Sequence, residues 1–148
     1  MKLVVDTNVL FTFFWKNSIA RELFVNLHLE LYSPDYALEE IKKHAGEIIK
    51  KTRLSESEFN SIRNKLVMMV SFVPLEEYGL TLQKALRLTP DKDDVDFFAL
   101  ALKLNCPIWS NDFALKVQNH VIMLNTKDII TLMAALKERS GIHTERIR

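Results

Sequence analysis

The sequence has little glycine and almost no cysteine, and these shortages exclude several kinds of site. Its 148 residues include three glycines and a single cysteine, Cys106. Three glycines are too few for a glycine-rich phosphate loop, and no GxxxxGK[ST] motif is present. One cysteine excludes an internal disulfide and a cysteine-based zinc site, which points to a reducing compartment. The four histidines show no zinc-ligand spacing either.

The chain also lacks a long apolar run and a large excess of either charge. No apolar run reaches the length of a bilayer, and the N-terminus opens directly into a strand-like run instead of a leader segment. We therefore expect a soluble, cytoplasmic protein. The formal net charge of +1 does not indicate a protein that coats a duplex. Basic residues nevertheless gather at 42–53 and acids at 91–96, a contrast that suits an enzyme acting on nucleic acid.

Short apolar runs alternate with helical patterns along the chain, and 48% of the residues are hydrophobic. The patterns predict strands at 2–5, 29–32, 72–73, 107–109 and 121–124, and helices at 18–27, 33–51, 55–70, 75–88, 93–104, 113–117 and 126–138. This alternation predicts an α/β fold with a central, mostly parallel sheet. We expect one domain over residues 1–148, with a mobile tail after about residue 139.

Two aspartates directly follow predicted strands. Asp6 follows Lys-Leu-Val-Val, and Asp112 follows Pro-Ile-Trp-Ser-Asn. Because the carboxyl ends of parallel strands meet at one edge of a sheet, these two side chains should lie at the same edge. Each of them taken alone could equally be a helix N-cap or a turn residue.

A third acid comes from the acidic run at 91–96, which precedes a nearly all-apolar helix. At about 100° per residue, Asp94 falls on the buried stripe of this helix. Asp96 falls on the opposite side, near Lys103, and is expected to face water. A buried carboxylate needs a partner, and a metal ion would provide one. A later start of the helix would turn Asp96 inward instead.

A fourth acid is one of two adjacent glutamates in the predicted helix 33–51. Glu40 lies at the flank of the apolar stripe, near His44, and we prefer it as the functional acid. Glu39 projects with Lys43 toward solvent, where the two would form an ordinary pair one helical turn apart.

A group of carboxylates without matching cysteine or histidine ligands suits a hard cation. Mg²⁺ or Mn²⁺ fits best, because these ions prefer oxygen ligands. Such an ion lowers the pKa of a bound water and neutralises charge on a phosphodiester. The candidate metal-binding and catalytic residues are Asp6, Glu40, Asp94 and Asp112.

Four motifs resemble those of the PIN-domain nucleases. They are Val-Asp-Thr-Asn-Val-Leu at 5–10, an acid after Ser-Pro-x-x-x-Leu, Asp-x-Asp-Asp followed by Phe-x-Ala-Leu-Ala, and Trp-Ser-Asn-Asp at 109–112. Each motif alone is weak, but the four occur in this order and at these spacings. The resemblance extends from residue 1 to about residue 137.

The resemblance implies a three-layer α/β/α sandwich and a Mg²⁺- or Mn²⁺-dependent endoribonuclease that hydrolyses RNA. It also implies that the four candidate carboxylates form the metal site, with Asn8 and Ser110 in support. Members of the family differ in where the helix of the third acid begins, so Glu39 competes with Glu40 and Asp96 with Asp94. Many members are the toxin of a toxin–antitoxin pair and many form homodimers. An antitoxin and a second copy are therefore expected partners.

The aromatic run Val9–Trp15 is larger than one short helix usually buries. We expect it to pack against a helix or to form a homodimer interface, because exposed apolar patches of this size mark interfaces. A role in stacking nucleic-acid bases is the less favoured interpretation.

Two other functions compete with a nuclease. The first is a non-catalytic RNA-binding or scaffold protein that retains the fold, and the intact set of acids argues against it. The second is a phosphatase with an aspartyl nucleophile. It ranks last, because Asp6-Thr7-Asn8 lacks the second aspartate of the common Asp-x-Asp motif.

Overall fold

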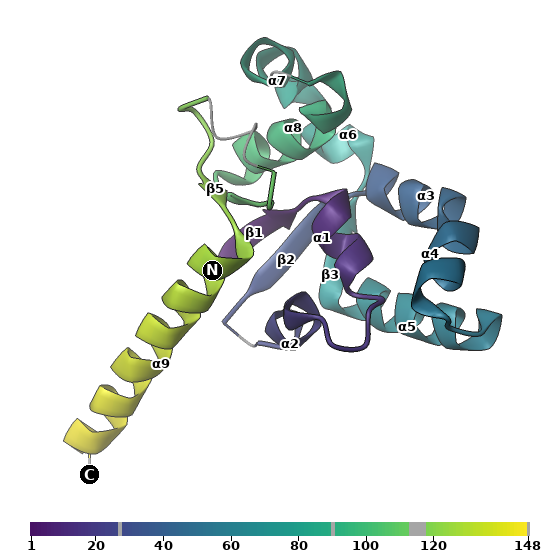
Figure 1. Ribbon diagram of the computed structural model, residues 1–148. Helices are drawn as coiled ribbons and strands as arrows, with labels where there is room; N and C mark the ends of the chain where they lie inside the picture. The colour runs from purple at the N-terminus through teal and green to yellow at the C-terminus, as the bar shows by residue number, and fades with distance from the viewer. Residues whose placement is uncertain (27, 90, 113–117, 148) are drawn as a thin grey trace.

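The computed structural model describes residues 1–26, 28–89, 91–112 and 118–147, with side chains described as far as residue 139. A five-stranded sheet in the order β3-β2-β1-β4-β5 forms the centre of this described part (Figure 1). All of its pairings are parallel. The strands are β1 (Lys2–Val5), β2 (Glu30–Pro34), β3 (Val70–Val73), β4 (Ile108–Trp109) and β5 (Met123–Leu124).

Helices occupy most of the connections between the strands and cover the sheet. They are α1 (Thr7–Thr12), α2 (Ile19–Phe24), α3 (Asp35–Lys43), α4 (Ala45–Thr52), α5 (Glu56–Met69), α6 (Leu75–Tyr78), α7 (Leu82–Leu88), α8 (Val95–Leu104) and α9 (Thr126–Ile147), with short 3₁₀ helices η1 (Gly79–Thr81) and η2 (Lys92–Asp94). The predicted α/β fold with a parallel sheet between helical layers is confirmed.

The central strand β1 is buried on both of its faces. Leu3, Val4 and Val5 are each 0% exposed, and consecutive strand residues point to opposite faces. In the parallel register, Val5 pairs with Trp109 at the end of β4. The residues that follow these two strands, Asp6 and Ser110, therefore emerge side by side at the carboxyl edge of the sheet.

The aromatic run after β1 is packed inside its own chain, apart from its exposed end. The ring of Phe13 stacks on that of Phe24 at 5.3 Å, and the ring of Phe14 stacks on that of Phe59 at 4.8 Å. Phe13 and Phe14 are buried, whereas Trp15 is 39% exposed. The argument from this run to a homodimer therefore no longer applies, because α2 and α5 already cover most of it.

Several helices differ in extent from the prediction. The predicted helix 33–51 is divided at His44, where the backbone leaves the helical region (φ −97°, ψ 11°). The predicted helix 75–88 is interrupted by η1, which begins at Gly79, a poor helix former. The helical turn predicted at 113–117 lies outside the described residues.

The closing helix α9 begins beside β5 and extends away from the body, with the C-terminus at its far end (Figure 1). It was predicted to end at residue 138 but continues to Ile147. Ile129 and Met133, one turn apart, are buried and anchor its first half. No helix in the described ranges combines the length and apolar character needed to cross a membrane.

The stacked pair Phe14–Phe59 makes a specific prediction about stability. Phe14→Ala should lower the free energy of unfolding by about 3–5 kcal/mol, because the truncation leaves a cavity between α1 and α5. Leu80→Ala is the matched control, since Leu80 is 98% exposed and should change stability by less than about 0.5 kcal/mol. Urea unfolding measures both. Equal losses in the two variants would contradict the packing described.

Candidate active site

Asp6 is a buried carboxylate at the junction of β1 and α1. Its side chain is the N-cap of α1, and its Oδ1 accepts a hydrogen bond from the backbone N–H of Val9 at 2.8 Å. The residue is only 6% exposed. Burial raises the pKa of Asp6, while hydrogen bonds from the Ser110 hydroxyl and from Val9 act in the opposite direction. The carboxylate is therefore fixed in direction by one donor from the first turn of α1 and one from the residue that follows β4.

Ser110 connects Asp6 to the segment after β4. It is 1% exposed, and its backbone N–H donates to the carbonyl of Leu124 at 2.9 Å, which holds it at the sheet edge. Its hydroxyl oxygen also accepts from the backbone N–H of Asp112 at 3.1 Å. Asp112 is exposed, and its negative charge contributes to the raised pKa of Asp6. The structure thus brings Asp6 and Asp112 to one edge, where the sequence predicted them.

Asp94 approaches the same edge from the N-terminus of α8. It is the last residue of η2 and the N-cap position of α8, and it is half-buried. Burial, together with the negative charges of Asp91, Asp6 and Asp112, raises the pKa of Asp94 to about 6. Asp94 also lines the same pocket as Asp6.

Glu40 faces these aspartates from α3. It lines a pocket of about 410 Å³ that also contains Asp6 and Asp94. The Tyr36 hydroxyl donates a hydrogen bond to Glu40, which raises the pKa of Tyr36. Nε2 of His44 lies 3.4 Å from Oε2 of Glu40. Glu39, the competing glutamate, is exposed and does not line the pocket.

The expected position of Asp96 was wrong. Instead of facing water, Asp96 is half-buried and accepts a hydrogen bond from the Tyr78 hydroxyl at 3.0 Å. Burial and this hydrogen bond raise the pKa of Tyr78. The cause is tertiary, because α6 packs against the first turn of α8. Asp96 does not line the pocket that holds Asp94.

The pocket contains residues that the sequence analysis did not assign to it. They are Thr7, Phe11, Tyr36, Lys43, His44, Asp93 and Phe97, in addition to Asp6, Asn8, Glu40 and Asp94. Tyr36 and His44 lie one helical turn on either side of Glu40, and Lys43 lies three residues after it. This spacing was a usable signal, since residues three and four apart share a helix face.

The donors at this site suit Mg²⁺ or Mn²⁺ in type, but the carboxylates do not form a closed cage. No three Asp, Glu, His or Cys side chains are close enough together to hold a metal ion by themselves in the part of the chain that is described. This arrangement suits Mg²⁺, which retains several waters and uses one or two carboxylates together with substrate phosphate. Asp6 and Asp94, with Asp112 and Glu40 nearby, would hold such an ion.

Comparisons with known proteins agree with this fold. A chain of the VapBC2 crystal structure from Rickettsia felis, bound to a DNA fragment from their promoter, has a similar fold, with a TM-score of 0.59. The two chains share 14% sequence identity, and the alignment covers 84% of this chain and 98% of that one. A sequence search of curated proteins found no significant match.

The sequence model of the PIN domain matches residues 4–119, most of the chain and every candidate acid. The chain therefore belongs to the PIN domain family, a family of nucleases.

Proposed function

We propose that the protein is a Mg²⁺- or Mn²⁺-dependent endoribonuclease that hydrolyses RNA phosphodiester bonds. The observation that carries this proposal is the pocket in which Asp6, Glu40 and Asp94 meet. There, burial in the first place, and then the negative charges of Asp91, Asp6 and Asp112, raise the pKa of Asp94 to about 6. Like charges held together at a sheet edge are unfavourable unless a cation neutralises them. A bound divalent ion would activate a water and offset charge on the phosphodiester.

The residues of the pocket have distinct proposed roles. Asp6 is a ligand whose direction is fixed by Val9 and Ser110. Glu40 is held across the pocket by hydrogen bonding to Tyr36 and by its contact with His44. Lys43 lies at the pocket with its charge available to a phosphate oxygen. The four candidate carboxylates would thereby place a metal-bound phosphate between β1 and α3.

We further propose that the protein is the toxin of a toxin–antitoxin pair and acts in the cytoplasm. The fold shared with a chain of the VapBC2 toxin–antitoxin complex supports an antitoxin as partner.

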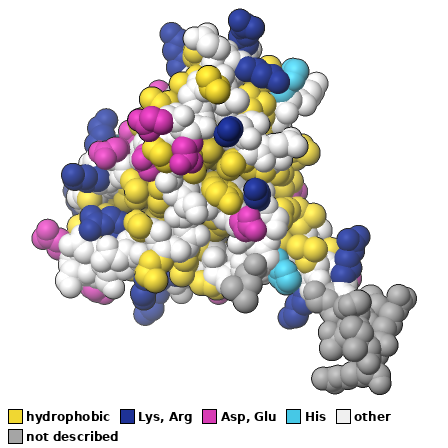
Figure 2. Space-filling model, turned by 180° about the vertical axis from the view of Figure 1, so that it is seen from behind, with side chains coloured by type: hydrophobic (Ala, Val, Ile, Leu, Met, Phe, Trp, Pro, Cys, Tyr) yellow, Lys and Arg dark blue, Asp and Glu magenta, His cyan; other side chains and the backbone are white. Residues whose placement is uncertain are grey.

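A homodimer is also proposed, on a different surface from the aromatic run. Hydrophobic side chains are exposed across the face seen in Figure 2. Val67 and Met68, at the end of α5, are 47% and 87% exposed beside the edge strand β3.

Two pairs of neighbouring acids test the assignment of the catalytic residues. Asp94→Asn should lower Mn²⁺-dependent cleavage of a single-stranded RNA by about 100-fold or more, since it removes a proposed ligand charge. Asp96→Asn should retain most activity, because asparagine still accepts the hydrogen bond of Tyr78. Glu40→Gln and Glu39→Gln form a second matched pair, with loss expected only at Glu40. Activity that depends on Asp96 and not on Asp94 would show that the assignment is wrong.

Divalent metal should stabilise the folded protein. A ligand that binds only the folded state raises the melting temperature by mass action, so millimolar Mn²⁺ should raise that of the wild type. The shift should be much smaller in Asp94→Asn. A melting temperature that does not respond to Mn²⁺ would count against the metal site, and metal binding without turnover on any RNA would favour the scaffold function.

The raised pKa of Asp94 predicts how the metal-free protein responds to pH. The pKa rises from 3.8 to about 6, so the folded state binds the proton more tightly than the unfolded state. The stability that this proton contributes is fully present below pH 3.8 and is lost as the pH rises through about 6.

In the Asp94→Asn variant, residue 94 cannot ionise. The variant therefore does not lose stability through this group as the pH rises. Thermal unfolding in EDTA should show the variant gaining stability relative to the wild type between about pH 4 and about pH 7. A constant difference in stability across that range would contradict the raised pKa of Asp94.

A further inference from the structure

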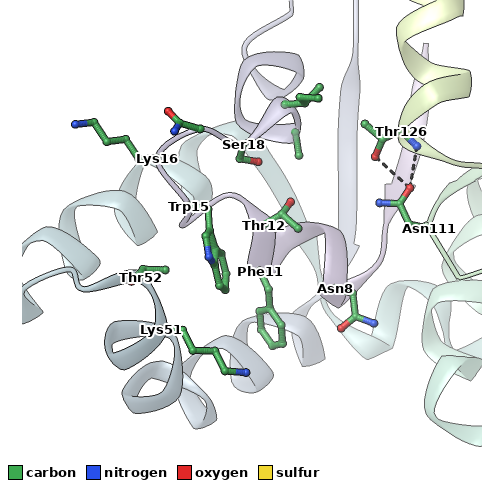
Figure 3. A pocket seen from close by; sticks show the side chains of 13 residues that line it. Asn8, Phe11, Thr12, Trp15, Lys16, Ser18, Lys51, Thr52, Asn111 and Thr126 are labelled. Atoms are coloured by element: carbon green, nitrogen blue, oxygen red, sulfur yellow. Dashed lines mark hydrogen bonds between the residues drawn. The ribbon is translucent and has the colours of Figure 1, made fainter.

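We propose that an open groove beside the acidic pocket holds a single-stranded nucleic acid, with Trp15 as the platform on which one base stacks. The inference deepens the proposed function, because it states how the substrate of the same site would be held. The groove has a volume of about 810 Å³. It is lined by Asn8, Phe11, Thr12, Trp15, Lys16 and Lys51, among others (Figure 3).

The groove adjoins the acidic pocket. Asn8 and Phe11, both on α1, line both cavities. A strand whose phosphate lies between Asp6 and Glu40 would therefore pass over Phe11 into the groove. The nucleotides next to the reacting phosphate are thus the ones that the groove would contact.

Trp15 is held rigidly at the side of this groove. Its N–H donates to the carbonyl of Thr12 and its carbonyl accepts from the N–H of Ser18, each at 3.1 Å. The preceding residues Phe13 and Phe14 are buried, so the backbone is anchored while the indole remains 39% exposed. Figure 3 shows the rings of Trp15 and Phe11 projecting beside each other into the groove. Rigid aromatic side chains give large contact areas at a low cost in conformational entropy.

The charges in the groove suit a phosphate backbone. Its described lining residues include Lys16 and Lys51 and contain no aspartate or glutamate, unlike the adjoining pocket. Lys51 pairs with Glu47 at 2.7 Å. This pair is exposed, and exposed ion pairs contribute little to stability, so a phosphate can compete for the lysine.

Polar groups complete the lining on the side of β4. Oδ1 of Asn111 accepts hydrogen bonds from the backbone N–H of Thr126 at 2.9 Å and from its hydroxyl at 3.1 Å. These bonds fix the amide with its nitrogen turned away from Thr126, where it can donate to a ligand (Figure 3). Aromatic platforms within a positively charged groove are the combination that single-strand-binding proteins use.

Binding of a short oligoadenylate in EDTA tests the proposal without depending on cleavage. The oligonucleotide should quench the fluorescence of the wild type. In Trp15→Phe the remaining tryptophan, Trp109, is 0% exposed, so its fluorescence should not respond. By anisotropy of a labelled oligonucleotide, Trp15→Leu should bind about 5- to 140-fold more weakly, the range for loss of one stacked base. Trp15→Phe should bind more tightly than Trp15→Leu, and Leu80→Ala, a change at an exposed residue outside the groove, should bind as the wild type does.

The salt dependence of binding tests whether Lys16 contacts the phosphate backbone. Lys16→Ala should reduce the slope of log affinity against log salt by about 0.7, the value for one contact to a single strand. Lys103→Ala, an exposed lysine on α8 outside the groove, should leave the slope unchanged. RNA binding and cleavage that are indifferent to both Trp15→Leu and Lys16→Ala would overturn the proposal and leave the groove to a protein partner. Quenching without cleavage in any metal would support the groove while contradicting the proposed function.

Discussion

The buried carboxylate of Asp6, at the end of the central strand, is the constraint on which the rest of the site depends. A carboxylate that is 6% exposed is costly to keep at that position, and the fold surrounds it with donors. The first turn of α1 supplies the N–H of Val9, and Ser110 reaches it from the next strand. The parallel register of β1 and β4 brings these groups together. The arrangement at the sheet edge thus follows from strand pairing and from one helix N-terminus.

Two adjoining regions near the sheet edge, the acidic pocket and the groove, differ in charge. Asp94 and Asp112 add negative charge near Asp6, and burial together with the neighbouring acids raises the pKa of Asp94. The adjoining groove has lysines and amides but no acid among its described lining residues. A cation in the acidic part and a phosphate backbone along the groove would complement these two regions. The same short helix, α1, borders both cavities, so in the proposed function its aromatic face and its N-cap would contact one substrate.

Local pattern predicted much of the fold and of the site, whereas contacts between distant segments accounted for the errors. Asp6 and Asp112 were placed at one edge because each closely follows a predicted strand. That placement depends only on parallel pairing of the strands. The prediction for Asp96 failed because its partner, Tyr78, comes from another helix. For the aromatic run the sequence left packing against a helix and a homodimer interface both open, and the contacts with Phe24 of α2 and Phe59 of α5 decide for packing within the chain.

The central claim is that the carboxylates at this edge share a divalent cation. Anomalous diffraction from crystals grown with Mn²⁺ locates such an ion directly. The account predicts a peak within coordination distance of the carboxylates of both Asp6 and Asp94, on the side that faces Glu40. A crystal at saturating Mn²⁺ with no peak there, or with Mn²⁺ bound only at other carboxylates, would contradict it.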